Sequence, residues 1–230
     1  MIPRKIHYCW FGGGQKGELA DRCMASWRRI LPGFEVVEWN ERNSDLSSRY
    51  AQEAMRQKRY SKVANLVRLA ALNEHGGVYF DTDVEVVRPI DALMRHDCFA
   101  GFQLVNKSDE WVNNAILGGI RGHQFFADCI EYTHRHFEST GELPLSPFVT
   151  TAVLKAYGLE QYGRQTVNGV HLYEREAFYP YSWEERYRPE VVTMNTYCVH
   201  HWEKSWVKSP WSPEVAWGRL RRFLGRRVSK

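Results

Sequence analysis

The chain has 230 residues, of which 43% are hydrophobic and 14% aromatic, so it is long enough to fold around one sizeable core. It holds no uninterrupted apolar stretch of about 18 residues, which excludes a transmembrane helix from the prediction. The five cysteines are scattered and form no Cys-x-x-Cys pair, so we predict free, mostly buried thiols. Such free thiols indicate a reducing cytoplasm, and the first residues, MIPRKIHYCWFGGG, lack the apolar core of a secretory signal and lead straight into a predicted strand.

The net charge of +4 is unevenly distributed along the chain. Residues 212–230 contain six basic residues and one acidic residue, a balance of +5, which leaves −1 for residues 1–211. A nucleic-acid-binding protein usually has a basic face on its folded body. We therefore predict no nucleic-acid partner.

The first half of the chain alternates between strand and helix signals. The run KIHYCW and the run FEVVEW predict strands, and apolar residues at helical spacing predict a helix between them. A polar helix and a second helix capped by Ser61 and ended by Gly76-Gly77 follow. In chain order, the predicted elements are a strand over 5–10, a helix over 18–31, a strand over 34–39 and helices over 47–58 and 61–74.

The second half continues the alternation. The predicted elements are strands over 77–80 and 84–87, a helix that begins at Pro89, strands over 98–102 and 115–120, and helices over 123–138 and 147–157. An aromatic-rich stretch then leads to YCVHHWEKSW. Strands alternating with helices indicate an α/β layer fold with a mixed or largely parallel sheet. We predict one domain over 1–211 and a basic amphipathic tail helix over 212–230.

Asp81 and Asp83 directly follow the apolar strand GVYF. In extended backbone, side chains two positions apart point to the same side, so both carboxylates can address one centre while Thr82 points away. Ligands of open α/β sheets bind beyond the carboxyl ends of the strands. Two carboxylates at such an edge suit Mg²⁺ or Mn²⁺ bridging to a diphosphate. A solvated turn or a calcium-binding loop is the alternative interpretation of this triplet.

The helix before this strand carries a charge in apolar surroundings. Asn65 and Arg68 are i, i+3 neighbours, and Arg68 is flanked by leucine, valine and alanine, so its charge needs a partner. That partner is either a ligand or a nearby carboxylate that neutralises the charge in the core.

Three segments together resemble the DXD-containing glycosyltransferases of family 32. They are IPRKIHYCWFGG, YSKVANLVRLAALNEHGGVYFDTDVEVVRPIDAL and HHWEKSW, in the order that the family shows. The family includes initiating mannosyltransferases and bacterial capsule and lipopolysaccharide enzymes. It is distantly similar to the glucosyltransferase domain of the large clostridial toxins. The resemblance implies a GT-A nucleotide-sugar-binding fold, with a mixed, mostly parallel sheet flanked by helices, and sugar transfer with retention at the anomeric carbon.

The resemblance also implies roles for individual residues. Trp10 matches the aromatic residue that stacks on the nucleotide base, and Arg68 matches an arginine that contacts the donor near its sugar and phosphate. Asp81 matches the aspartate that binds ribose and sugar hydroxyls, and Asp83 the one that ligates Mn²⁺ or Mg²⁺. Asn114 matches a segment that lines the donor sugar.

The closing motif contributes two adjacent histidines and a tryptophan. His200, His201 and Trp202 match the segment that closes over the diphosphate, where a histidine completes the metal shell. Neighbouring residues at a strand end point to opposite faces, so at most one of the two histidines reaches the metal. We favour His201 as the ligand and keep His200 as the alternative.

One position departs from the family pattern. Many members have Ala-Ser-Asp where this chain has Val63-Ala64-Asn65. The aspartate holds sugar hydroxyls as a charged acceptor, whereas Asn65 forms a weaker, neutral hydrogen bond. We therefore expect Asn65 to bear on the identity of the donor sugar.

The predicted function is a metal-dependent glycosyltransferase of bacterial surface polysaccharide synthesis. The expected donor is a UDP-sugar, with a GDP-sugar as the alternative, and the expected acceptor is a saccharide or a lipid-linked glycan. The tail over 212–230 is expected either to lie on an anionic membrane surface or to pack on the domain. A carbohydrate-binding module without transfer activity and a nucleotidyltransferase are the competing functional hypotheses.

Overall fold

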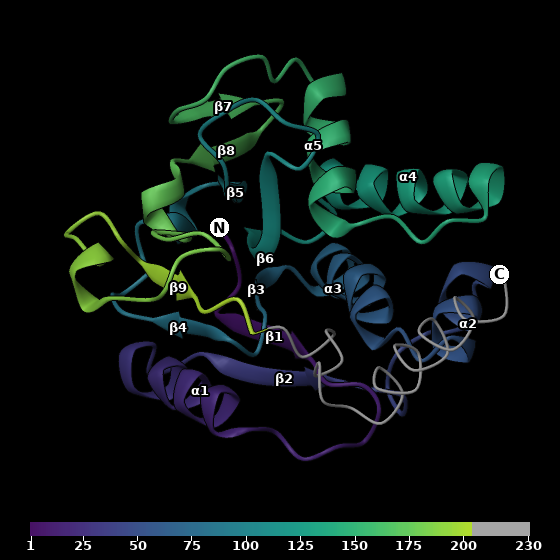
Figure 1. Ribbon diagram of the computed structural model, residues 1–230, viewed down its shortest axis with the longest axis horizontal. Coiled ribbons are helices and arrows are strands. Elements are labelled where there is room, and N and C mark those ends of the chain that lie inside the picture. The colour runs from purple at the N-terminus through teal and green to yellow at the C-terminus, as the bar shows by residue number, and fades with distance from the viewer. Residues whose placement is uncertain (204–230) are drawn as a thin grey trace, which may run out of the picture.

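The computed structural model of the protein describes residues 1–203. Figure 1 shows helices packed on both sides of a central sheet, with a small second sheet beside it. The strands are β1 Lys5–Cys9, β2 Glu35–Trp39, β3 Gly77–Phe80, β4 Val84–Val86, β5 Cys98–Phe102, β6 Val112–Gly119, β7 Gln165–Val167, β8 Val170–Tyr173 and β9 Cys198–His200. The α-helices are α1 Glu18–Ile30, α2 Arg49–Arg56, α3 Tyr60–His75, α4 Gln124–Thr140 and α5 Ser146–Ala156, and short 3₁₀ turns cover Leu93–Arg95, Arg175–Ala177 and Pro189–Val191.

The central sheet has seven strands in the order β2-β1-β3-β6-β5-β8-β7. The strands β2, β1, β3, β5 and β8 run in one direction, whereas β6 and β7 run antiparallel to their neighbours. The predicted mixed, mostly parallel sheet flanked by helices is therefore confirmed. The second sheet pairs β4 with β9 over three residue pairs.

Each face of the central sheet has its own hydrophobic core. Side chains of α2, α3, α4 and α5 form one core, and α1 forms the other together with β4 and β9. Along β3 the alternation is strict, since Tyr79 joins the first core and Val78 and Phe80 join the second. A strand buried on both faces is continuously apolar, and its first polar residue, Asp81, therefore marks the end of the strand.

A pair of glycines turns helix α3 directly into strand β3. Gly76 and Gly77 have φ angles of +64° and +112°, and a Cβ atom on Gly77 would lie 2.8 Å from the carbonyl oxygen of Lys5. Only glycine fits this left-handed, crowded turn. The turn places α3 against the strand that follows it, so Arg68 and Asp81 come from consecutive elements.

Three segments differ from the sequence-based expectation. The helix predicted from Pro89 is wrong: the chain has only a 3₁₀ turn at Leu93–Arg95, because Ile90, Leu93 and Met94 must reach the core within the short link between β4 and β5. The β7–β8 hairpin and strand β9 were not predicted. Both are short and lie in an aromatic-rich stretch without clear alternation.

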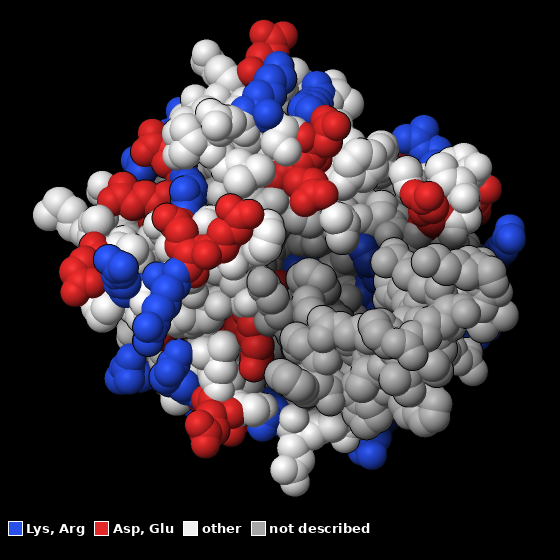
Figure 2. Space-filling model, viewed as in Figure 1, with Lys and Arg blue, Asp and Glu red and all other residues white. Residues whose placement is uncertain are grey.

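The remaining general expectations concern cysteines, membrane spans and charge. All five cysteines are free and buried, as predicted. Among residues 1–203 no helix is both long and apolar enough to cross a bilayer. Basic and acidic side chains are interspersed over the face shown in Figure 2. The predicted tail helix over 212–230 lies outside the described residues.

Candidate active site

The segment 81–83 joins the two sheets. Asp81 extends β3 at its carboxyl end, where its N–H donates to the carbonyl of Ala115 (2.9 Å). The N–H of Val84 then donates back to the carbonyl of Asp81 (3.0 Å), which closes a tight turn into β4. Asp81 and Asp83 therefore lie at the edge of the sheet where α/β proteins bind ligands.

Asp81 is held by groups from α3 and β3. Arg68 forms an ion pair with it (Nη2 to Oδ1, 2.9 Å), and the hydroxyl of Tyr79 donates to the same oxygen (2.8 Å). The guanidinium of Arg68 also lies over the Tyr79 ring, 4.4 Å from its centroid. Burial by itself lowers the pKa of Arg68, but the neighbouring Asp81 carboxylate outweighs it, and the pKa ends above its usual value.

Arg68 also orients Asn114 on β6. Its Nη1 donates to both the backbone oxygen (2.7 Å) and the side-chain oxygen (3.0 Å) of Asn114. A guanidinium can only donate, so the amide oxygen must face Arg68 and the amide nitrogen must face away. That nitrogen is buried and has no hydrogen-bond partner within residues 1–203. Arg68 itself is only 4% exposed, and its contacts in this structure are to Asp81, Asn114, Tyr79 and the carbonyl of Ala64.

Asp83 is held from the other side by the end of β9. Its Oδ1 lies 3.2 Å from Nε2 of His200, and its Oδ2 accepts from the backbone N–H of Glu203 (2.7 Å). Burial raises the pKa of Asp83, but the charge of His200 and these hydrogen bonds outweigh it, so the pKa is lowered overall. Burial likewise lowers the pKa of His200, and the Asp83 carboxylate reverses this and raises it.

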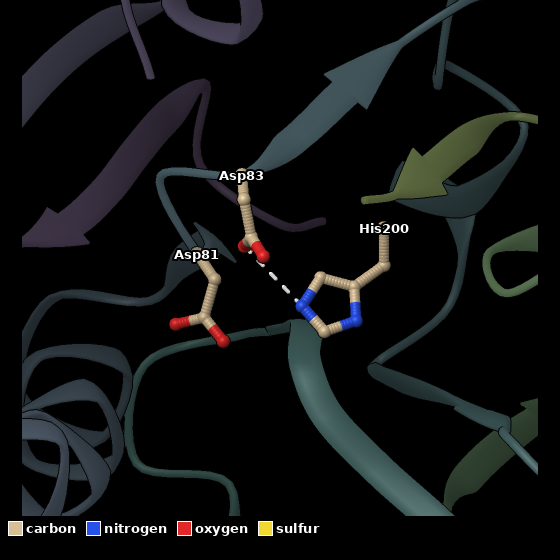
Figure 3. Close-up of side chains that lie close together, drawn as sticks. All are labelled: Asp81, Asp83 and His200. Carbon is tan, nitrogen blue, oxygen red and sulfur yellow. Dashed lines mark ion pairs between the residues drawn. The ribbon is translucent and has the colours of Figure 1, made fainter. Parts of the chain in front are cut away.

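Asp81, Asp83 and His200 converge on one point (Figure 3). Each offers one ligand atom, and these atoms all lie within 4.8 Å of one another. Two carboxylates and an imidazole suit Mn²⁺ or Mg²⁺. Nε2 of His200 faces Asp83, and its other ring nitrogen, Nδ1, points away from the aspartates and is buried without a hydrogen-bond partner among the described residues. The residues present therefore fit a divalent cation.

The preference for His201 as the metal-site histidine is wrong in this structure. His200 faces Asp83, whereas Nε2 of His201 lies 2.8 Å from Glu85. The two rings point apart, as expected for neighbouring residues. His200 pairs with Val84 in the β4–β9 register, and this pairing brings it, not His201, to the aspartates.

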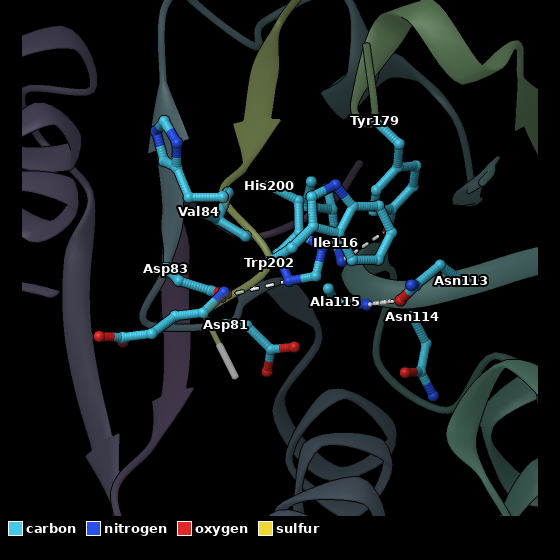
Figure 4. A network of polar contacts seen from close by, with 12 residues as sticks. Asp81, Asp83, Val84, Asn113, Asn114, Ala115, Ile116, Tyr179, His200 and Trp202 are labelled. Carbon is cyan, nitrogen blue, oxygen red and sulfur yellow. Dashed lines mark hydrogen bonds and ion pairs between the residues drawn. The ribbon is translucent and has the colours of Figure 1, made fainter. Parts of the chain in front are cut away.

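Trp202 packs against His200, the histidine of the candidate cation site. Its ring centroid is 4.3 Å from that of His200, and Figure 4 shows the two side chains together beside Asp81 and Asp83. The Trp202 indole N–H donates to the carbonyl of Tyr181 (2.9 Å). Trp202 thus forms one wall of the candidate site.

Trp10 lies at the same edge of the sheet, because β1 and β3 are parallel neighbours. Its indole N–H donates to the carbonyl of Gly14 (2.7 Å), and Nζ of Lys16 lies 5.4 Å from its ring centroid. Lys16 also forms an ion pair with Glu38 (2.7 Å), at the end of β2. The base-stacking role of Trp10 stays a prediction.

Sequence reasoning missed several residues of this edge. They are Lys16 and Glu38 beside Trp10, Tyr79 beside Asp81, and Tyr181, Glu85 and Glu203 beside the histidines. A polar residue next to a strand end was the signal available for Glu38. The others become visible only through their contacts.

Asn65 is half-buried on α3, one turn before Arg68. Its side chain makes no hydrogen bond to any of residues 1–203, so it is available to a ligand. The role of Asn65 in the choice of donor sugar stays a prediction.

Two family models match consecutive parts of the chain. Residues 17–100 match the glycosyltransferase sugar-binding region containing a DXD motif, and residues 120–217 match the alpha 1,4-glycosyltransferase conserved region. The first match contains Asp81 and Asp83, and the second contains helices α4 and α5 and the closing motif, whereas Asn114 lies between the two matches.

The curated proteins that are similar to this chain are named as sugar transferases. Inositol phosphoceramide mannosyltransferase 3 of Schizosaccharomyces pombe is 24% identical over 222 residues, which is 87% of this chain and 60% of the relative. Lactosylceramide 4-alpha-galactosyltransferase of Rattus norvegicus is 31% identical over 150 residues, which is 60% of this chain and 39% of the relative. The chain therefore spans less than two thirds of the length of these two relatives.

Solved structures support the fold. The PaToxG glycosyltransferase superimposes with a TM-score of 0.55 at 13% identity, covering 67% of this chain and 69% of that one. The galactosyltransferase LgtC gives a TM-score of 0.50 at 15% identity, covering 94% and 93%. Taken with the motif matches, these similarities confirm the resemblance seen in the sequence: residues 17–100 match the DXD-containing sugar-binding region of glycosyltransferases, and the chain has the GT-A fold.

Proposed function

We propose that the protein is a metal-dependent, retaining glycosyltransferase that uses a nucleoside-diphosphate sugar, with UDP-sugar as the donor. The observation that carries this proposal is the convergence of Asp81, Asp83 and His200 within 4.8 Å at the carboxyl edge of the sheet. Such a site suits a cation that also binds the donor diphosphate. The DXD-region match supports the same assignment.

In this proposal each residue has a distinct task. Asp83 and His200, with Asp81 beside them, would hold the cation, which would supply positive charge next to the leaving diphosphate. Arg68 keeps Asp81 and Asn114 in place for the ribose and sugar hydroxyls, since its donors are directed at these two residues. Trp10 stacks on the base, and Trp202 closes the site over the diphosphate.

In this proposal the acceptor hydroxyl attacks the anomeric carbon without an enzyme base. As the bond from this carbon to the diphosphate breaks, the departing phosphate oxygen takes the hydroxyl proton on the same face of the sugar. Trp202, which packs on His200, would shield the leaving group from water.

The acceptor is proposed to be a saccharide or lipid-linked glycan of bacterial surface polysaccharide synthesis. The names of the two relatives described above each include a ceramide lipid, which supports an acceptor carrying a lipid. We place the reaction in the cytoplasm at the inner face of the plasma membrane, with residues 212–230 as the contact. Deleting these residues should reduce sedimentation with anionic vesicles while binding to neutral vesicles stays the same; unchanged sedimentation would contradict this contact.

A thermal-stability screen tests the function. UDP-, GDP- and CMP-sugars are added with and without Mn²⁺, and a nucleotide sugar that raises the melting temperature only with Mn²⁺ supports the proposal. A free saccharide that stabilises the protein without any nucleotide effect would favour the carbohydrate-binding module. Stabilisation by nucleoside triphosphates rather than nucleotide sugars would favour the nucleotidyltransferase.

A further inference from the structure

A second carboxylate–histidine pair lies directly beside the candidate metal site. His201 Nε2 is 2.8 Å from Oε2 of Glu85, and the hydroxyl of Tyr181 is 3.3 Å from Nδ1 of His201. An ionised carboxylate can only accept, so Nε2 carries a proton and donates to Glu85, while Nδ1 forms its hydrogen bond with the tyrosine hydroxyl. Both nitrogens are therefore occupied, and the His201 side chain is only 5% exposed. Its contacts hold it in place and leave no nitrogen for a ligand.

The backbone around His201 is wrapped around Asp83. The N–H of His201 donates to the carbonyl of Asp83 (2.9 Å), and the N–H of Glu203 donates to its carboxylate (2.7 Å). Between them, Trp202 has a φ of +56°, a left-handed conformation that costs free energy in any residue but glycine. This strained turn is what brings the N–H of Glu203 back to Asp83.

The β4–β9 ladder alone is a weak anchor for this turn. The ladder has three residue pairs and ends at His200, one residue before the turn begins. Beyond that point His201 contacts Glu85, Tyr181 and the ring of Tyr187 (centroids 4.9 Å apart). Trp202 contacts the Tyr181 carbonyl and packs on the rings of His200 and Tyr179. Of these contacts, the ion pair of His201 with Glu85 is the one that ties the turn to β4 through charge. These contacts hold the strained turn on both sides.

We propose that Glu85, His201 and Tyr181, here called the His201 clamp, position Asp83 and His200 for the divalent cation. The inference rests on the proposed function of that site. The clamp acts through the backbone: it fixes residues 200–203, and these residues set where the imidazole of His200 and the carboxylate of Asp83 stand. Glu85, His201 and Tyr181 are positioning residues: Glu85 and His201 do not belong to the cluster of Asp81, Asp83 and His200, and Tyr181 acts through its contact with His201.

Two substitutions at one position separate positioning from charge. Glu85→Ala removes the acceptor for His201, whereas Glu85→Gln keeps an amide oxygen that can still accept from Nε2. Both variants lose the same negative charge near the cation. Glu53→Gln, which breaks a surface ion pair on α2, is the matched control. Circular dichroism and the melting temperature verify that each variant is folded.

The first readout is binding of Mn²⁺ alone, followed by the signal of free Mn²⁺ in electron paramagnetic resonance. Glu85→Ala should weaken binding about tenfold, as loss of a supporting contact to a metal site does, while Glu85→Gln and Glu53→Gln stay close to wild type. Donor hydrolysis by Glu85→Ala should recover at high Mn²⁺, because the ligands themselves are intact. Wild-type Mn²⁺ affinity in Glu85→Ala, or equal loss in Glu85→Ala and Glu85→Gln, would overturn the clamp.

A second readout keeps the clamp testable apart from the function. Hydrogen exchange of the amides of His201 and Glu203, which donate to Asp83, should accelerate in Glu85→Ala and not in Glu85→Gln. If the wild-type protein binds no divalent cation, the proposed function fails, and the exchange rates still decide the clamp. Unchanged exchange at residues 201–203 in Glu85→Ala would refute it.

Discussion

The two aspartates of the site are held by parts of the chain that differ greatly in sequence distance. Asp81 is paired with Arg68, 13 positions earlier, and with its near neighbour Tyr79. Asp83 is held by residues 200–203, of which Glu203 is 120 positions away. The Asp81 side is thus complete once α3 packs on β3, whereas the Asp83 side requires the return of the chain through β9. The first side belongs to the core of the fold and the second closes over it, so substitutions on the two sides should have different effects.

The largest effect on activity is expected from Asp83→Ala. The variant loses the carboxylate that faces His200, and Mn²⁺-dependent donor hydrolysis should fall by about 10²–10³, because charge on the leaving diphosphate is no longer neutralised. The variant should remain folded, since the core around β3 is untouched, but its melting temperature should fall because the buried His200 loses its partner. Initial rates at saturating donor measure this, with the exposed Asp91→Ala as control. Undiminished turnover would remove Asp83 from the site.

Arg68→Met should affect stability as well as activity, and here the loss falls on the core between α3 and β3. It removes the partner of Asp81 and of Asn114 from a position that is 4% exposed. Losing one partner of a buried pair costs about 3–5 kcal/mol, and the low end applies because the Asp81 side chain stays 28% exposed. Urea denaturation gives the free energy of unfolding. Arg68→Lys is the matched variant, and a stability of Arg68→Met equal to the wild type would contradict the assigned role of Arg68.

The substitution Asn65→Asp tests whether this residue, on the Asp81 side of the site, affects which donor sugar the protein uses. A charged acceptor strengthens a hydrogen bond to a sugar hydroxyl by about 1 kcal/mol, which is roughly fivefold in kcat/KM. The ratio of kcat/KM for two nucleotide sugars that differ in one hydroxyl measures the shift, and the free energy of unfolding should not change. An unaltered ratio for every donor pair would separate Asn65 from donor selection.

The smallest effect concerns His7, which supports the turn between α3 and β3. One ring nitrogen contacts the Gly76 carbonyl (2.8 Å) and the other accepts from Trp39 (3.1 Å). Burial lowers the pKa of His7 and outweighs the Gly76 hydrogen bond, which raises it. The folded protein therefore binds fewer protons than the unfolded chain, so the stability from His7 is complete above about pH 6.5 and is lost as the pH falls toward the lowered pKa.

Denaturation curves between pH 7 and pH 5 measure this dependence. His7→Gln should flatten the fall of the unfolding free energy in this range, whereas His136→Gln on α4 should follow the wild type. A wild-type slope in His7→Gln would show that other groups cause the acid dependence.

The Asp81 side was largely predictable because its signals are local. A continuous apolar strand that ends in Asp-x-Asp, a charge in an apolar helix and a Gly-Gly turn between them are all visible within residues 60–83. For Arg68 the sequence left two alternative partners, a ligand or a nearby carboxylate. Its ion pair with Asp81 shows that it has a carboxylate partner in this structure, and Asn114 accepts a further hydrogen bond from it.

The Asp83 side was predicted only in outline. The closing motif was expected at the site, but the choice between His200 and His201 depended on the register of β9 with β4, which no local pattern encodes. The helix expected from Pro89 failed for a related reason, since the core contacts of Ile90 and Leu93 override local helix signals.

By itself, the amino-acid sequence determined which donor atoms are available and where strands end, because hydrogen-bonding capacity, charge and backbone preference belong to each residue and its near neighbours. The tertiary structure decided which of these groups meet. It brought His200 to the aspartates, turned His201 to Glu85 and directed the guanidinium of Arg68 at Asp81 and Asn114. Such pairings depend on strand register and on contacts between residues more than a hundred positions apart, and only the folded chain establishes them.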